Sequence, residues 1–373
     1  MLGGVARNEI LTTVRGLAAP ERVLEVLRVV ADTAGPSQTA SDTRGVAIHA
    51  LLEGRGNLGE EALYERNLAG TGCDVLRVGT GAGIRIVAHL DEISYLLAGH
   101  EDTDGWPLAP FCYHLAEGPR EAAVLRHRPQ QGYQIVSTGT LDGPPDRVRY
   151  RSLDGDELHP GDRIILRSAI EADLGTGRVT GSLDNAAGVS AALLAAEACQ
   201  KLGVPVTVVL TDEEEGPAGA SSQTIARGAA RLAPVLEPTT LTVVVDVHGL
   251  PPTVNAEVGD HRVPFGASLA EYSSGGRGAV TPPPLFHQIR ELLDHPDSSQ
   301  LRVTTNLGGH VPRSDDVIAT LASPAVCLLG YPGSDRHFDQ GLPATNLQDL
   351  VDLTRALTML AAAFAGDPDE EGA

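Results

Sequence analysis

Histidine and carboxylate side chains follow several short apolar runs of this sequence. The run Ile84–His89 is followed directly by Leu90, Asp91 and Glu92. If the run is a strand, its side chains alternate between two faces, so His89 and Asp91 point the same way and Asp91 can orient the imidazole. Taken alone, a core histidine beside a charge at a strand end is the commoner explanation of such a segment.

Two further segments carry carboxylates where the chain turns. Asp184 closes a turn in GSLDNAAG, residues 181–188, and precedes an Ala-rich stretch, so it is either a helix N-cap or a ligand. The segment Thr211–Gly216 places four carboxylates in a row after an apolar run. Adjacent like charges repel one another unless solvent or cations neutralise them, and at the end of a buried strand a bound cation is the simpler explanation.

The last two segments add one carboxylate and one histidine. Asp246 ends the run Val243–Val245, and His337 follows the apolar run 325–330. In an open α/β sheet the ligand crevice lies at the carboxyl ends of the strands. Two histidines and several carboxylates gathered at such an edge form a mixed N/O ligand set that suits zinc, cobalt or manganese. The sequence therefore predicts a metal site.

The elements that would position these residues are those of an α/β fold with a mixed sheet sandwiched by helices. Short apolar runs predict buried strands, and apolar residues at helical spacing predict covering helices. The expected strands are 84–89, 206–211, 242–247 and 325–330, and the expected helices are 185–202 and 346–364. The segment 249–282 is rich in Gly, Pro and Ser and predicts loop with scattered strand.

Residues 98–178 have a different texture, in which turn signals separate short strand-like pieces such as Tyr133–Ser137 and Arg163–Leu166. This block predicts a small all-β domain inserted into the α/β domain. The predicted domains are then 1–97 together with 179–373, which carry the candidate site, and the insert 98–178.

Composition excludes several classes of partner. The chain has 49 acidic and 28 basic residues, a net charge of −21, and such a surface repels both nucleic acid and anionic membranes. The N-terminal segment lacks the apolar stretch of a secretory signal, and no later run is long enough to span a bilayer. Cys73, Cys112, Cys199 and Cys327 are widely spaced, which favours free buried thiols in a reducing cytoplasm.

In combination, these segments resemble the di-metal glutamyl and tetrahedral aminopeptidases. That family has an AHxDEIG strand, a GxxxDDRxG turn, an EEVGxxGA turn, a strand ending in Asp, and a late PxxxxH. This chain has, in the same order, AHLDEIS (88–94), GSLDNAAG (181–188), EEEGPAGA (213–220), Val245-Asp246 and PGSDRH (332–337). The inserted β-domain also falls between the first two motifs, as in the family, where it is a barrel.

The resemblance implies a role for each matching residue. Five would be metal ligands for two divalent ions, with zinc the first expectation and cobalt or manganese the alternatives: His89, Asp184, Glu214, Asp246 and His337. Asp184 would bridge both ions, Glu213 would be the general base, and Asp91 would orient His89. The resemblance further implies an aminopeptidase that acts on short peptides, a homo-oligomer, and a cis peptide bond between Asp184 and Asn185.

The chain also departs from the family pattern. Ser94 replaces a glycine, Asn185 replaces the second aspartate and Glu215 replaces a valine. Where the family has a Gly-Gly-Thr-Asp loop beside the substrate, this chain has GGHVPRSDD over 308–316. The substrate preference is therefore not carried over. Candidate substrate contacts are His310 and Arg313, and His248 can support the metal ligands because it shares a strand face with Asp246.

Two other functions stay open at this point. The altered 308–316 loop is compatible with a specialised metal-dependent amidohydrolase or deacylase that acts on one modified metabolite. A catalytically inactive assembly paralogue is the second alternative, although the expected base and ligands are all present in the sequence.

Overall fold

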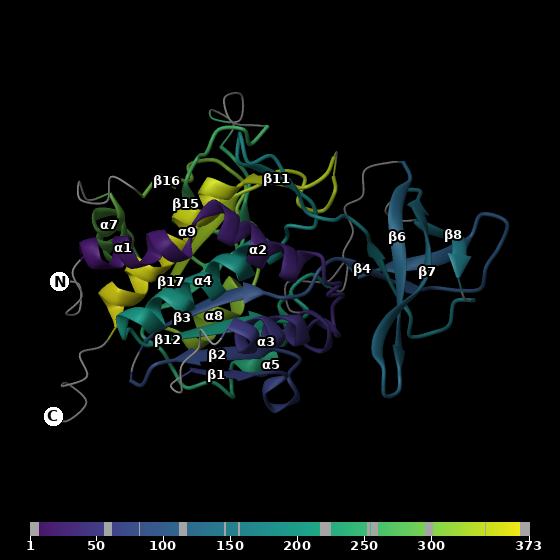
Figure 1. The fold of residues 1–373 in the computed structure, drawn as a ribbon, viewed down its shortest axis with the longest axis horizontal. Coiled ribbons are helices and arrows are strands. Elements are labelled where there is room, and N and C mark those ends of the chain that lie inside the picture. Colours follow the sequence, from purple (N-terminus) through teal and green to yellow (C-terminus); the bar gives the residue numbers. More distant parts are fainter. Residues whose placement is uncertain are drawn as a thin grey trace.

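The structure is a computed structural model that describes residues 7–365 apart from 56–61, 82, 112–117, 145–146, 156, 217–224, 252–253, 255–259, 295–300 and 340. An α/β layer structure and a separate β-barrel lie side by side (Figure 1). The α/β layers carry every candidate site residue named above, and the barrel begins with strand β4 (Ser94–Leu97).

A mixed sheet forms the centre of the α/β part. Its strands lie in the order β1 (Ala62–Glu65), β2 (Asp74–Val78), β12 (Val206–Thr211), β3 (Ile84–His89), β13 (Thr242–Val245), β17 (Val326–Pro332), β15 (Ala267–Ala270) and β16 (Val303–Thr305). The central strands β12, β3, β13 and β17 are parallel to their neighbours within this group, whereas β1, β2 and β15 make antiparallel pairings. The short β14 (Val247–His248) continues beside β17. The predicted mixed sheet is confirmed.

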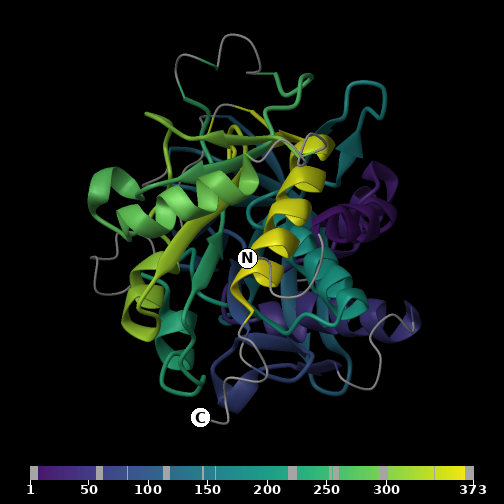
Figure 2. The ribbon, with the colours of Figure 1, turned by 90° about the vertical axis from the view of Figure 1, so that its left-hand side faces the viewer.

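Helices cover both faces of this sheet. One face packs against α1 (Arg7–Leu17), α2 (Pro20–Ala31), α3 (Arg44–Arg55), α4 (Ala186–Leu202), α7 (Pro283–Leu293) and α9 (Leu347–Phe364). Figure 2 shows α9 in front of the sheet with α4 beside it. Small alanines let α4 pack closely, and nearly all of its residues are buried. The opposite face packs against the shorter α5 (Arg227–Leu232) and α8 (Asp316–Ala322).

The inserted all-β domain is a closed barrel with its own core. Its strands are β4 (Ser94–Leu97), β5 (Trp106–Pro110), β8 (Arg149–Gly155), β7 (Gly132–Asp142), β6 (Arg120–Arg128) and β9 (Arg163–Leu166), in that order around the barrel. Buried Tyr95, Trp106 and Tyr150 lie in its interior. Strand β10 (Glu171–Ala172) pairs with β11 (Arg178–Thr180), which in turn pairs with β18 (Ala344–Asn346), so these three strands form a small sheet outside the barrel. The proposed division at residues 98 and 178 stays a prediction.

Most of the elements expected from the apolar patterns are present with small shifts. The strand expected over 242–247 is divided at Asp246, which lies between β13 and β14. The loop-rich segment contains β15 and the short 3-10 turn η3 (Ser274–Gly276), and further 3-10 turns are η1 (Ala40–Asp42) and η2 (Leu68–Gly70).

Cys73, Cys199 and Cys327 are buried free thiols, whereas Cys112 lies outside the described residues. Within those residues, no helix has the length and apolar character needed to cross a membrane.

Candidate active site

The candidate ligands meet at the carboxyl edge of the central parallel strands. His89 is the last residue of β3, Asp246 follows β13, and His337 follows β17. The acidic run 212–215 follows β12, the parallel neighbour of β3. Asp184 reaches the same edge from the turn between β11 and α4. Parallel strands place their carboxyl ends together, so residues distant in the sequence become neighbours.

Asp184 lies between the two histidines. Its Oδ1 is 3.1 Å from Nε2 of His89, and its Oδ2 is 3.4 Å from Nε2 of His337. The Asp246 carboxylate is 3.7 Å and the Glu214 carboxylate 4.0 Å from Nε2 of His89. Glu215 lies on the other side, with Oε2 3.1 Å from Nε2 of His337. The cluster thus has two halves joined by one carboxylate.

The donor set of this cluster fits metal binding. Ligand-type atoms of His89, Asp184 and Glu215 all lie within 4.8 Å of one another, and all three residues are buried. Oε1 of Glu215 has no hydrogen-bond partner among the described residues. Several buried carboxylates against two imidazoles leave an excess of negative charge, which is expensive in a low-dielectric interior unless cations compensate it. Divalent cations with N/O preference suit these residues.

The carboxylates and imidazoles also shift one another's pKa. Burial alone would lower the pKa of His89, but Glu214, Asp184 and Asp246 raise it well above the usual value. Burial would raise the pKa of Asp184, yet hydrogen bonds to His337 and His89 hold it below the ordinary range. The opposite charges therefore stabilise each other at this edge of the sheet.

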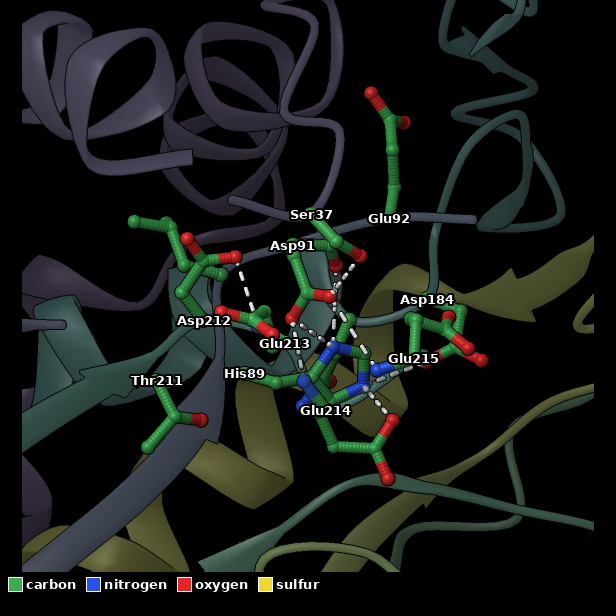
Figure 3. Close-up of polar contacts among 12 residues, drawn as sticks. Ser37, His89, Asp91, Glu92, Asp184, Thr211, Asp212, Glu213, Glu214 and Glu215 are labelled. Atoms are coloured by element: carbon green, nitrogen blue, oxygen red, sulfur yellow. Dashed lines mark hydrogen bonds and ion pairs between the residues drawn. The ribbon is translucent and has the colours of Figure 1, made fainter. Parts of the chain in front are cut away.

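Asp91 holds both the first histidine and the acidic run (Figure 3). Its carboxylate accepts hydrogen bonds from the Ser37 hydroxyl at 2.5 Å and from the backbone N–H groups of Glu214 at 3.1 Å and Glu215 at 3.3 Å. Nδ1 of His89 lies 3.1 Å from the Asp91 carbonyl oxygen. A proton on Nδ1 would be donated to that carbonyl, which leaves Nε2 free to face the cluster.

Glu213 is turned away from the cluster. Its backbone has φ +56°, and its carboxylate accepts a hydrogen bond from Nη2 of Arg231 at 2.7 Å, with Nη1 of Arg227 at 3.7 Å. The preceding Asp212 accepts the N–H groups of Gln38 at 2.9 Å and Glu213 at 2.8 Å. The structure therefore brings Glu214 and Glu215 to the histidines, where the sequence placed Glu213 and Glu214. The two arginines of the α5 region hold Glu213 out of this position.

The turn before α4 has the geometry expected from the sequence. The Asp184–Asn185 peptide bond is cis, which confirms that prediction. Asn185, not Asp184, caps α4: its side chain accepts the N–H of Gly188 at 3.2 Å and donates to the Val245 carbonyl at 2.7 Å. The interpretation of Asp184 as an N-cap is therefore wrong.

Comparison with known families decides the identity of this chain. The model of Peptidase family M20/M25/M40 matches residues 173–363, slightly more than half of the chain, and this range includes Asp184, Asp246 and His337. The chain belongs to this peptidase family. The expected relationship to co-catalytic metallopeptidases is thus confirmed, and no curated protein sequence matches this peptidase.

Solved structures share the whole fold of this peptidase, barrel included. A TET aminopeptidase from Thaumarchaeota archaeon SCGC AB-539-E09 is 14% identical with a TM-score of 0.71, over 94% of this chain and 99% of that one. An aminopeptidase from Desulfurococcus kamchatkensis is 16% identical with a TM-score of 0.69, over 92% and 95% of the two chains. The Pyrococcus horikoshii TET1 peptidase is 16% identical with a TM-score of 0.67, over 91% and 99%. The likeness confirms the predicted fold.

His248, His310 and Arg313, the candidate supports and substrate contacts from the sequence, lie in different surroundings. His248 is buried, and its Nδ1 is 2.9 Å from the Ser268 hydroxyl. Burial lowers the pKa of His248 to about 4, so the ring is neutral at pH 7. The backbone carbonyl of His310 accepts the N–H of Gly249 at 2.7 Å, and Gly249 directly follows β14. The side chain of Arg313 lies beside Gly278.

The structure adds residues that the sequence patterns did not single out. Arg336 lines a gap beside Asp184 and Glu215, and Ser37 hydrogen-bonds Asp91 from a distant segment. Burial opposes the charge of Arg336, but the surrounding carboxylates raise its pKa. Arg336 directly precedes the expected ligand His337 in the sequence, and this position was a signal that could have identified it. Ser37 lies in no motif, so no such signal was present for it. The guanidinium of Arg336 therefore borders the acidic cluster.

Proposed function

We propose that this peptidase is a two-metal aminopeptidase that removes N-terminal residues from short peptides. The observation that carries the proposal is the position of Asp184, whose two carboxylate oxygens face His89 at 3.1 Å and His337 at 3.4 Å. Two structural neighbours of this chain are named as aminopeptidases, which supports the reaction class.

The proposed ligand sets follow the two halves of the cluster. His89, Asp184 and Asp246 would hold one ion, and Asp184, Glu215 and His337 the other. Zinc is the first choice for these N/O ligands, with cobalt and manganese as alternatives. When bound, the ions would supply Lewis acidity to the scissile carbonyl and to an attacking water. This set replaces Glu214 by Glu215 relative to the sequence expectation.

Glu214 is the proposed general base. Its carboxylate is near the cluster, 4.0 Å from Nε2 of His89, without being one of the closest partners of either histidine. Burial, opposed by His89, raises the pKa of Glu214 well above its usual value. A carboxyl group in that position can take a proton from water and return it to the leaving amine. Glu213 is the base expected from the sequence, but its carboxylate accepts a hydrogen bond from Arg231.

Other chain residues position these groups. Asp91 would orient His89 and fix the backbone of Glu214 and Glu215 through its carboxylate. Arg336 lines a gap beside Asp184 and Glu215 and is a candidate substrate contact, and His310 is a second candidate. His248 and Arg313 stay weaker candidates for such contacts.

Assembly and location complete the proposal. The Pyrococcus horikoshii relative assembles into a tetrahedron or a large octahedral shell, which supports a homo-oligomer for this chain. Three buried free thiols favour a reducing cytoplasm. The net charge of −21 disfavours nucleic acid and anionic membranes as partners.

A panel of aminoacyl-anilides tests the reaction. The zinc-loaded protein should hydrolyse at least some anilides with a free α-amine, and N-acetylation of the same substrates should abolish turnover. Equal turnover of the acetylated compounds would instead identify a deacylase or amidohydrolase. Failure to hydrolyse any compound with metal bound would favour the specialised enzyme or the inactive paralogue and would contradict the proposal.

A further inference from the structure

A cavity lies on the sheet face that packs against α5 and α8, away from the cluster of histidines and carboxylates. The empty space in the cavity and at its open mouth together amounts to about 320 Å³. Its floor is formed by side chains of β3, β12 and β13, and its sides by the two short helices and Leu236. None of the proposed metal ligands lines it.

The walls of this cavity are mostly apolar. Buried Val87 and Val209 project from the sheet, and Leu232 and Ala319 come from the helices. Ala233, Leu236, Ile318 and Ala322 are only partly buried, so the entrance lies between the two helices. An apolar molecule could therefore enter without passing the catalytic edge of the sheet.

Three polar atoms of the lining residues have no hydrogen-bond partner in the described part of the chain. These are Nε of Arg85, Oγ1 of Thr242 and Oδ1 of Asp315. Buried polar groups are normally satisfied, so three orphans around one cavity indicate that something polar completes the site. The cavity is thus amphipathic.

Arg85 is the most unusual of the three. It is 6% exposed, and within the described residues no carboxylate forms an ion pair with it. In the described part of the chain, its one side-chain hydrogen bond goes from Nη2 to the Glu237 carbonyl. A buried cation without a countercharge is costly, and an anion that enters the cavity would lower this cost.

The polar groups lie at opposite ends of the cavity. Thr242 is the register partner of Arg85 across β13 and β3, so hydroxyl and guanidinium share one end. Asp315 accepts a hydrogen bond from Thr211, whose register partner is His89. Arg85 and His89 are four residues apart on β3, roughly 13 Å at the usual strand rise. The valines lie between the two ends.

We propose that this cavity binds a small aliphatic monocarboxylate. The carboxylate accepts hydrogen bonds from Nε of Arg85 and from the Thr242 hydroxyl. The alkyl chain lies along Val87 and Val209 and ends short of Asp315, whose Oδ1 is left to water. An anionic group matches the uncompensated cation, and an unbranched apolar chain matches the walls. This site is separate from the peptidase reaction and does not depend on the proposed function.

Calorimetric titration of the zinc-loaded protein with acetate, butyrate and hexanoate tests the proposal. Each added methylene should tighten binding about three- to fourfold until the cavity is filled. Hexylamine, which has the same chain and the opposite charge, should not bind. Absence of hexanoate binding, or equal affinity for acetate and hexanoate, would overturn the proposal.

Variants place the binding at this cavity and not at the metal site. Arg85→Met should weaken hexanoate binding at least tenfold, and Ala319→Leu, which fills the cavity and leaves the charge in place, should abolish it. Arg290→Met is the matched control and should bind hexanoate as the wild type does, because Arg290 pairs with Asp294 on α7, on the other face of the sheet. Hexanoate binding that survives both Ala319→Leu and Arg85→Met would refute the site.

Discussion

The Asp91 carboxylate accepts the backbone N–H of Glu214 at 3.1 Å. This bond ties the residue that follows β3 to the acidic run that follows β12, and the adjacent N–H of Glu215 is bonded to the same carboxylate at 3.3 Å. One buried side chain therefore sets the place of a proposed base and of a proposed ligand. Its effect on His89 runs through the backbone carbonyl, 3.1 Å from Nδ1.

Asp91→Asn should lower kcat about 10- to 100-fold, the usual effect of disturbing a group that orients metal ligands. The amide can accept only on its oxygen, so its NH2 group would face the N–H donors of the acidic run. Metal content and kcat should be measured together. Ser37→Ala, which removes one donor to Asp91, should have a much smaller effect, and a wild-type kcat in Asp91→Asn would contradict the positioning role.

Glu214→Gln and Glu213→Gln distinguish the proposed base from the one expected by sequence. Glu214→Gln should reduce kcat by a factor of about 10² to 10⁴, because an amide cannot accept the proton from water. Glu213→Gln should keep most of the activity, since that carboxylate contacts Arg231 and not the histidines. Both variants should retain the wild-type metal content. The reverse ranking of the two kcat values would restore Glu213 as the base.

Asp349 should make stability depend on pH far from the active site. This buried carboxyl at the start of α9 accepts the N–H of Gly266, and burial raises its pKa to about 8. Its unfolded pKa is about 3.9. Between these values the folded state holds a proton that the unfolded state has lost, so the stabilising effect of protonation is complete below pH 4 and disappears as pH rises through 8.

Asp349→Asn should therefore gain stability relative to the wild type as pH increases. The difference in unfolding free energy should grow by about 1–3 kcal/mol between pH 6 and pH 8.5, as measured by urea denaturation. Asp294→Asn, at an exposed position on the C-terminal end of α7, serves as the control and should show no such trend. A constant difference across this pH range would rule out a buried neutral carboxyl at Asp349.

The sequence predicted the fold well because buried parallel strands appear as apolar runs that end in polar residues. The runs at His89 and Asp246 show this, since both lie at the carboxyl edge as expected. The assignment within the acidic run could not be predicted in the same way. Which carboxylate faces the histidines depends on the φ of +56° at Glu213 and on Arg231, which reaches it from a separate helix. Such tertiary contacts leave no local pattern.

The central claim is that Asp184 joins two metal sites, and metal stoichiometry tests it most directly. Elemental analysis after zinc loading and removal of excess metal should give about two ions per chain for the wild type. Asp184→Asn should bind one ion or fewer, because this carboxylate faces both His89 and His337. Glu213→Gln, the matched control, should keep two. One ion or none in the wild type, or two in Asp184→Asn, would contradict the account.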